Sequence, residues 1–593
     1  MSTQSTRPAT LPALIAARVV AHAPRTILRK KDRGIWQAIT WAALGARIRA
    51  IGAALKQEGV GRGVVAGILG EAGPDWIAAD LAIQGAGGVS LGLPPTDPAA
   101  ATAATLRASG CRVLFVENEE QLDKVLHIRD ACPQLVAIVI MDMKGLRDFT
   151  DPMCESLAEF SARGAALDAA DPAAWGRGVE AIAPADIAIL AATSGTSEAP
   201  RLVALSHANL MTQIDHAAEL TGQSAADERL GFLPLSLVTE RLFGLYLALA
   251  CGTISNLVES AETVPENLQE LRPTVMFAIP RIWQKLHATV MISAAGATWV
   301  QRRLFAWAMR QAAPRAEGKP LGGLAALADR LVLAPVRRAI GLDRARLAFV
   351  GGTPVSDELV RWFLTLGVNL RQIYGTAECG GLAALSPADS VRSGAVGVPV
   401  SWGELAVAGD GEVRLRGPHV CAGLWRDGAL HPATDAEGWL HTGDLGRMEA
   451  GQLVLTGRQG EAITTADGAT TLPAGFESRV KLSPYIADAV LVGHGRASLA
   501  CLVVLEFDVV EKWAQDRNVP FTSTASLVRA EPVVALIKAE LAARAPEMRL
   551  AAFRILARRI EPEDPEVTPA MRLRRHYVLQ KYDDLIEDMY RAA

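Results

Sequence analysis

Residues 190–207 read LAATSGTSEAPRLVALSH, and this stretch carries the strongest signal in the chain. The apolar run that ends at Ala192 suits a buried strand. Hydroxyl residues then surround a glycine: Thr193, Ser194, Gly195, Thr196, Ser197. Such a loop exposes N–H and hydroxyl donors that suit phosphate oxygens, and Arg201 can neutralise phosphate charge. For the loop taken alone, a plain Ser/Thr/Gly turn is the alternative.

Composition limits the class of protein. A chain of 593 residues is too long for one hydrophobic core, so roughly two to four domains are expected. The net charge of −4 provides no basic field for nucleic acid, so no nucleic-acid partner is expected. Seven scattered cysteines without a CxxC pair argue against a zinc or disulfide framework and fit a reducing compartment.

Targeting signals are not expected. Residues 1–25 lack the pattern of a signal peptide. The longest uncharged apolar stretch, residues 242–258, is short for a membrane span and is interrupted by glycine, so we predict a buried helix followed by a strand. A cytoplasmic protein is therefore expected.

Short apolar strands alternate with helical patterns as far as about Leu385. Residues 41–57 have an apolar helical face, and Val89–Leu93 reads as a strand. This alternation predicts parallel α/β layers. From Gly403 the strand candidates are short and separated by turns, as at Glu412–Arg416, which predicts a β-rich subdomain.

The pattern of predicted elements changes again after Gly457, where strand-like segments and a helical segment are mixed. We therefore predict an α/β fold with a large N-terminal domain and a small C-terminal α+β domain. The predicted domains are 1–456 and 457–593.

The hydroxyl-rich loop resembles the phosphate-binding loop of the adenylate-forming superfamily, which includes acyl-CoA synthetases and luciferases. Further segments match that family in order: Val350–Pro354 (VGGTP), Tyr374–Glu378 (YGTAE), Trp439–Gly446 (WLHTGDLG) and Gly457–Arg458. Each is weak alone, but five in order are specific. The resemblance implies the adenylate-forming fold, in which a hinge near 458–460 leads into a mobile C-terminal domain.

Within that superfamily the chain resembles long-chain fatty acyl-CoA synthetases, and the similarity runs from Trp36 to Tyr582. The matching features are Leu233–Leu235 with Glu240–Arg241, Pro273–Thr274 with Ile279–Trp283, a helical insertion at 301–341, and a Val567–Arg575 ending followed by Lys581–Tyr582. Leu237 stands where those enzymes usually have histidine.

The resemblance implies a reaction in two halves. A fatty acid carboxylate attacks the α-phosphorus of ATP, which gives an acyl adenylate and pyrophosphate. The thiol of coenzyme A then displaces AMP to give a thioester. Because the first half brings two anions together, the protein must supply positive charge and position both reactants. Mg²⁺ that bridges phosphate oxygens is expected as well.

The resemblance also assigns roles to residues. Glu378 and the hydroxyl of Thr196 are predicted metal ligands, Asp444 a ribose acceptor and Arg458 a second ribose or phosphate contact. Gly460 is the predicted pivot, because glycine absorbs large backbone rotations. The alternatives are a solvated carboxylate for Glu378, a turn aspartate for Asp444 and a surface ion pair for Arg458. The predicted ATP-binding residues are Thr193, Ser194, Gly195, Thr196, Ser197, Arg201, Gly352, Thr353, Pro354, Tyr374, Gly375, Thr376, Asp444 and Arg458.

Three residues depart from the family pattern in the predicted catalytic apparatus. Glu198 replaces a glycine and Arg201 a lysine in the phosphate loop. Arg572 replaces the lysine that bridges carboxylate and α-phosphate, and it is the predicted catalytic residue together with Glu378. A planar guanidinium is not equivalent to an ammonium at a tight site. Three hypotheses stay open: a fatty acid–CoA ligase that uses arginines, a regulatory pseudo-ligase that binds nucleotide or acyl ligand, and a fatty acyl-AMP ligase that loads a carrier protein.

Residues 301–346 hold ten basic residues against three acidic ones, with Phe305 and Trp307 among them. Such a surface can contact anionic lipid, which would place the protein peripherally at the inner face of the membrane. The alternative is a solvated helical face with buried aromatic side chains.

Overall fold

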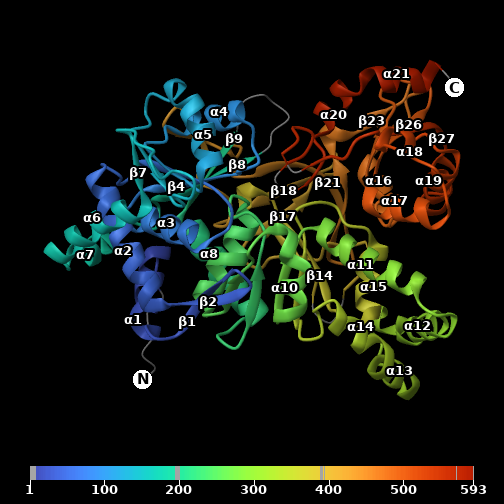
Figure 1. Cartoon of the computed structure of the whole chain (residues 1–593), viewed down its shortest axis with the longest axis horizontal. Coiled ribbons are helices and arrows are strands. Elements are labelled where there is room, and N and C mark those ends of the chain that lie inside the picture. Colours follow the sequence, from blue (N-terminus) through green and yellow to red (C-terminus); the bar gives the residue numbers. More distant parts are fainter. Residues whose placement is uncertain are drawn as a thin grey trace.

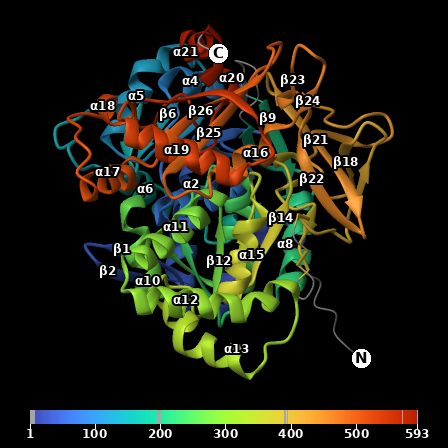
Figure 2. The same cartoon turned by 90° about the vertical axis from the view of Figure 1, so that its right-hand side faces the viewer.

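The computed structural model describes residues 8–193, 201–387, 391–392, 394–561, 563–568 and 571–591. Two nine-stranded sheets with helices packed against them form the larger part of the chain (Figure 1). The residues from Gln459 onward, called the C-terminal part below, carry smaller sheets of their own. The C-terminal part lies at the top in both views, and a helical insertion projects at the bottom (Figure 2).

The first large sheet has the strand order β20-β19-β9-β8-β4-β3-β5-β6-β7. It is parallel from β8 to β7, whereas β9, β19 and β20 are antiparallel to their neighbours. Its strands are β3 (Val65–Leu69), β4 (Val89–Leu93), β5 (Val113–Val116), β6 (Ala137–Ile140), β7 (Cys154–Ser156), β8 (Ile187–Thr193), β9 (Arg201–Ser206), β19 (Gly423–Arg426) and β20 (Ala429–His431).

The second large sheet has the order β16-β15-β14-β13-β12-β10-β11-β1-β2 and is parallel from β14 to β1. Its strands are β1 (Thr26–Asp32), β2 (Ile35–Thr40), β10 (Glu228–Gly231), β11 (Ile254–Leu257), β12 (Val275–Ala278), β13 (Leu347–Val350), β14 (Leu370–Tyr374), β15 (Ala384–Leu385) and β16 (Val398–Pro399). The mainly parallel sheets confirm the predicted α/β class.

A four-stranded antiparallel sheet, β17-β18-β21-β22, forms the predicted β-rich region. The C-terminal part holds the pair β23-β24 and the sheet β25-β26-β27. The bounds are β17 (Glu404–Val407), β18 (Glu412–Arg416), β21 (Leu440–Glu449), β22 (Gln452–Arg458), β23 (Ile463–Thr464), β24 (Thr470–Thr471), β25 (Ile486–Val492), β26 (Leu499–Leu505) and β27 (Leu550–Ile555).

Helices cover the faces of the sheets. Those before the C-terminal part are α1 (Leu11–His22), α2 (Trp41–Gln57), α3 (Pro74–Gly85), α4 (Ala99–Ser109), α5 (Glu119–Ile128), α6 (Leu157–Ala170), α7 (Ala174–Glu180), α8 (His207–Thr221), α9 (Leu247–Cys251), α10 (Val264–Leu271), α11 (Pro280–Gly296), α12 (Trp299–Ala312), α13 (Gly323–Ala328), α14 (Ala334–Ala339) and α15 (Asp357–Leu366). Those in it are α16 (Pro473–Val480), α17 (Phe507–Asp516), α18 (Thr524–Leu527), α19 (Glu531–Arg544), α20 (Arg575–Lys581) and α21 (Asp583–Arg591).

Short helical turns complete the backbone. Two are π-helical, η2 (Glu240–Tyr246) and η5 (Asp329–Leu333). The others are η1 (Arg129–Ala131), η3 (Ala261–Thr263), η4 (Ala313–Glu317), η6 (Ala377–Cys379) and η7 (Gln459–Glu461).

Helix α2 shows how local sequence sets an element. Its N-cap Thr40 accepts a hydrogen bond from the N–H of Ala43 at 3.2 Å, which satisfies one free donor of the first turn. The helix then buries its apolar face, as its spacing predicts. Helix α6 packs against it at Gly164, where a Cβ would lie only 1.8 Å from the carbonyl oxygen of Ala50.

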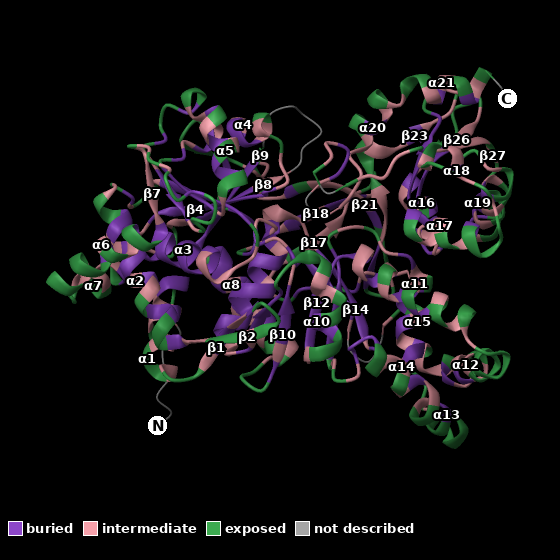
Figure 3. Ribbon diagram, in the orientation of Figure 1, coloured by how far each residue is buried: buried purple, intermediate pink, exposed green. Residues whose placement is uncertain are grey.

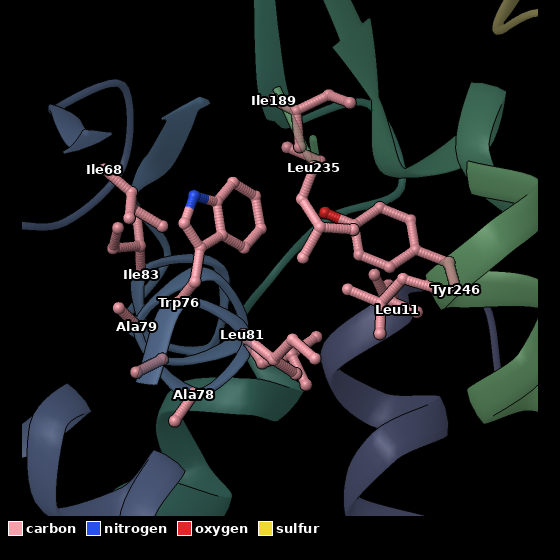
Figure 4. Close-up of a cluster of buried hydrophobic side chains, with 14 of the residues drawn as sticks. Leu11, Ile68, Trp76, Ala78, Ala79, Leu81, Ile83, Ile189, Leu235 and Tyr246 are labelled. Carbon is pink, nitrogen blue, oxygen red and sulfur yellow. The ribbon is translucent and has the colours of Figure 1, made fainter. Parts of the chain in front are cut away.

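The core of the larger part joins residues from distant segments. Leu11, Trp76, Leu235 and Tyr246 meet in one cluster (Figure 4), and the strands of both large sheets are mostly buried (Figure 3). Residues 242–258 form a buried helix followed by β11, as predicted, although the helix begins at Glu240 as a π-helix.

The Glu240–Arg241 pair of the family-like segment lies inside this core. Arg241 forms an ion pair with Asp80, and the hydroxyl of Tyr246 donates to the same carboxylate at 2.7 Å. Glu240 forms an ion pair with Arg229. Because an unpaired buried charge is costly, each charge is matched: the Arg241–Asp80 pair holds the π-helix against α3, and the Glu240–Arg229 pair holds it against β10. The segment therefore has a structural role here.

The C-terminal part has hydrophobic cores of its own, built around β25 and β26. It also touches the larger part: Met571 packs against an apolar cluster there, and Arg574 forms an ion pair with Asp97 at 3.5 Å. We propose that the small domain begins at Gly457, and the boundary between 456 and 457 remains a prediction.

Candidate functional site

The site begins where the strands β8 and β9 open into the hydroxyl-rich loop. Thr193 and Arg201 are paired in the ladder, and the Thr193 hydroxyl donates to the carbonyl oxygen of Arg201 at 3.3 Å. Residues 194–200 lie outside the described residues. The predicted contacts of Ser194, Gly195, Thr196 and Ser197, and the position of Glu198, therefore remain predictions.

Arg201 faces the acidic residue that follows β14. Its Nη1 lies 3.7 Å from Oε1 of Glu378, whose side chain is largely buried. Glu378 sits in the turn η6, and its carbonyl oxygen accepts a hydrogen bond from the N–H of Cys421 at 2.6 Å. The predicted phosphate cation and the predicted metal ligand are thus neighbours in space.

The turn that carries Glu378 is tight. A Cβ at Gly375 would lie 2.3 Å from the carbonyl carbon of Gly381, so only glycine fits there. The Thr376 hydroxyl is buried and, within the described part of the chain, has no hydrogen-bond partner. A buried hydroxyl without a partner suits a polar ligand atom.

Asp444 is held from two sides. The hydroxyl of Tyr374, at the end of β14, donates to its Oδ2 at 2.9 Å, and Nε of Arg458 donates to its Oδ1 at 2.8 Å. Asp444 and Arg458 are partners in the β21–β22 ladder. Burial, followed by the nearby Asp444 charge, raises the pKa of Tyr374 well above its ordinary value, so the phenol stays a hydrogen-bond donor at neutral pH.

Thr442 and Gly443, the two residues before Asp444, hold the backbone of β21 against β18 by hydrogen bonds. The Thr442 hydroxyl donates to the carbonyl oxygen of Val413 at 2.6 Å and accepts from the N–H of Asp444 at 3.1 Å. Gly443 adopts φ +68°, and its N–H donates to Oε1 of Glu412 at 3.2 Å. The backbone polar groups are therefore occupied, while the Asp444 carboxylate faces Tyr374 and Arg458.

The glycine-rich turn after β13 lies against β14. A Cβ at Gly351 would lie 2.5 Å from Cγ1 of Ile373, and Gly352 adopts φ +88°. Thr353 and Pro354 line a cavity of about 60 Å³ between the two parts of the chain. Arg572 lines the same cavity from the C-terminal side.

Arg572 has a partner that sequence analysis did not predict. Its guanidinium forms an ion pair with Glu461. Its backbone N–H donates to the Thr568 hydroxyl at 3.2 Å, and its carbonyl oxygen accepts from the Thr568 N–H at 2.8 Å. Glu461 directly follows the predicted hinge at 458–460, and this position is a sequence signal that could have pointed to it.

The guanidinium of Arg458 interacts electrostatically with three nearby carboxylates. Burial by itself lowers the pKa of Arg458, but the carboxylates of Asp444, Glu461 and Glu378 outweigh this and raise it. The structure therefore gathers the predicted residues Arg201, Tyr374, Glu378, Asp444 and Arg458 in one charged site. Arg572 joins them through Glu461 and the cavity. Gly460 lies in η7, where an added Cβ would meet no atom within 4 Å.

Comparisons with known proteins identify the family of the chain. The profile of the AMP-binding enzyme family matches residues 15–425, and the profile of the AMP-binding enzyme C-terminal domain matches residues 460–593.

Two curated relatives are from mycobacteria. The putative fatty-acid–CoA ligase fadD11 of Mycobacterium tuberculosis is 33% identical over 426 residues, which cover 69% of this chain and 74% of the relative. The long-chain-fatty-acid–CoA ligase FadD15 of Mycobacterium bovis is 29% identical over 595 residues and 97% of both chains.

Among solved structures, the A-PCP didomain of carboxylic acid reductase from Segniliparus rugosus, in complex with AMP, matches with a TM-score of 0.77. It is 19% identical and covers 99% of this chain and 82% of that chain, which supports the fold alone. The family profile spans well over half of the sequence, and its C-terminal companion covers the rest from Gly460 onward. The chain therefore belongs to the AMP-binding enzyme family.

Proposed function

We propose that this protein activates a long-chain fatty acid with ATP, through an acyl adenylate, to an acyl-CoA thioester. The relative named a long-chain-fatty-acid–CoA ligase aligns over 97% of both chains, which supports this substrate class. The observation that carries the proposal is the Asp444 carboxylate between Tyr374 and Arg458, beside the Glu378–Arg201 pair.

The nucleotide would bind to this charged site. The two oxygens of Asp444 would accept hydrogen bonds from a ribose diol, with Tyr374 and Arg458 fixing the carboxylate. Arg201 and Arg458 would neutralise phosphate charge, and the buried Thr376 hydroxyl would donate to a polar ligand atom. Gly352, Thr353 and Pro354 would lie against the adenine.

Glu378 would hold Mg²⁺, which would neutralise charge on the phosphate oxygens during attack by the carboxylate. A single largely buried carboxylate beside a phosphate loop fits that ion, because Mg²⁺ binds few protein carboxylates and keeps phosphate and water ligands. Thr196 would supply a hydroxyl from the loop. Arg572 would approach the carboxylate and the α-phosphate from the C-terminal side.

ATP–pyrophosphate exchange with C6 to C18 fatty acids and Mg²⁺ tests this proposal. Exchange by the unmodified protein establishes adenylation, and the acid with the highest rate names the chain length. Arg572→Lys is measured in parallel. Exchange by the lysine variant alone would overturn the proposal in favour of a regulatory pseudo-ligase.

The acceptor is tested with preformed acyl adenylate. Thioester formation on coenzyme A supports the ligase. Transfer only to the pantetheine of a carrier protein would instead identify a fatty acyl-AMP ligase.

We also propose that the protein is cytoplasmic and contacts the inner face of the membrane through residues 301–346 and the start of α12. Trp299, Leu324 and Leu331 are 59%, 65% and 64% exposed, and Arg303 lies over the Trp299 ring at 4.4 Å. The insertion projects from the molecule (Figures 1 and 2). Exposed apolar side chains with cations favour an anionic lipid surface.

Sedimentation with phosphatidylglycerol vesicles tests this contact. Leu324→Ser/Leu331→Ser is expected to lose binding, and Val20→Ser, which changes an exposed side chain on α1, is the control. Equal sedimentation of all three proteins would contradict the proposal. Among the described residues, no helix is long and apolar enough to span a bilayer.

A further inference from the structure

Glu461 and Arg572 form a partly buried ion pair, and neither belongs to a long helix or a strand ladder. Their side chains are 22% and 33% exposed. Glu461 ends the turn η7, and Arg572 lies between Thr568 and α20. Both line the cavity that Thr353 and Pro354 close from the other side.

The pair restrains one edge of the guanidinium. The contact joins Nη2 of Arg572 to Oε1 of Glu461. Within the described part of the chain, Glu461 is its only side-chain partner, so the remaining N–H groups stay available to a ligand. Thr568 fixes the backbone of Arg572 through two hydrogen bonds. The arginine is therefore held at its backbone and at one nitrogen.

We infer that Glu461 is a positioning residue that directs Arg572 toward the reacting carboxylate and α-phosphate. The inference rests on the proposed function. A planar guanidinium presents its donors in fixed directions, so it must be oriented where a compact ammonium would not need to be. Glu461 also reduces the local positive charge, so its contribution is orientation rather than attraction of anionic substrates.

Both partners lie on the C-terminal side of Gly460. A rotation about the predicted hinge would carry them together and leave the ion pair intact. The contacts of Met571 with the apolar cluster and of Arg574 with Asp97 cross the hinge, and such a rotation would break them. Glu461 thus keeps Arg572 oriented through the cycle, ready for the next adenylation.

Glu461→Gln tests the inference, because it keeps the shape and removes the charge. We expect kcat for pyrophosphate exchange to fall about tenfold with no rise in KM for ATP, since orientation is lost and positive charge is gained. Glu461→Asp should restore part of the rate. Thioester formation from preformed acyl adenylate should change less than about twofold.

A double-mutant cycle separates positioning from a structural role. If Glu461 acts through Arg572, then Glu461→Gln should have no further effect on exchange in an Arg572→Ala protein. The control is Glu547→Gln, which breaks the Arg479–Glu547 ion pair of the same part of the chain. It should leave both half-reactions unchanged. The thermal midpoint of Glu461→Gln should stay within about 2 °C of the parent value.

Two outcomes would overturn the inference. One is an unchanged exchange rate in Glu461→Gln while the parent protein exchanges normally. The other is an equal loss in the Arg572→Ala background. Failure of the proposed function looks different, because the parent protein then shows no exchange with any acid. In that case the affinity of the parent and Glu461→Gln proteins for a non-hydrolysable acyl-adenylate analogue decides: equal affinities would overturn the inference.

Discussion

Asp444 is the residue on which nucleotide binding should depend most. It offers two acceptor oxygens, and both are oriented by donors from separate strands. We expect Asp444→Asn to weaken AMP binding by about thirtyfold, because a hydrogen bond to a charged group contributes more than one between neutral groups. Isothermal titration calorimetry with AMP measures this change.

Tyr374→Phe is the variant to compare with Asp444→Asn. It removes one hydrogen bond to the carboxylate and keeps the ring, so the expected loss of AMP affinity is about threefold. If both variants bound AMP like the parent, ribose recognition would have to lie elsewhere in the site.

Among the elements, the turn η7 is where flexibility should matter. Gly460 has free space around its Cβ position and is absent from the residues with positive φ, so this arrangement does not itself require glycine. We expect Gly460→Ala to fold normally and Gly460→Pro to slow acyl-CoA formation about tenfold, because proline restricts φ at the pivot. Pyrophosphate exchange should stay near the parent rate.

The two half-reactions are measured separately on the same Gly460→Pro preparation. Equal losses in both would indicate a local folding defect instead of a hinge. No loss in either would move the pivot away from Gly460.

For the whole molecule, the Asp97–Arg574 ion pair joins the C-terminal part to the larger part. Both side chains are partly buried, and burial raises the pKa of Asp97 although Arg574 and Lys124 oppose it. We expect Asp97→Asn to favour other domain arrangements and to lower pyrophosphate exchange about threefold. Small-angle X-ray scattering should show a larger radius of gyration.

Asp508→Asn is the control for that measurement, because it weakens an exposed ion pair with Arg559 inside the C-terminal part. It should change neither the scattering nor the exchange rate. A scattering curve of Asp97→Asn identical to the parent curve would show that the ion pair does not hold the two parts together.

Local sequence patterns are enough to predict the α/β layers and the class of site. Helix 41–57 and the strands Val89–Leu93 and Glu412–Arg416 follow from local periodicity and turn residues, and the structure has them at the same bounds. Motifs such as WLHTGDLG also predicted the family, because short spacings along one chain fix which groups can reach a nucleotide.

Which charged side chains form pairs depends on how the sheets and the two parts of the chain pack together. Asp444 stands opposite Arg458 through strand register, and Tyr374 reaches it from another sheet. Glu461 with Arg572, and Asp97 with Arg574, lie more than a hundred residues apart in the chain. The Glu240–Arg241 pair is structural because the core around it buries both charges with their partners. Such pairings cannot be predicted from local sequence, because residues far apart in the chain come into contact only when the sheets pack.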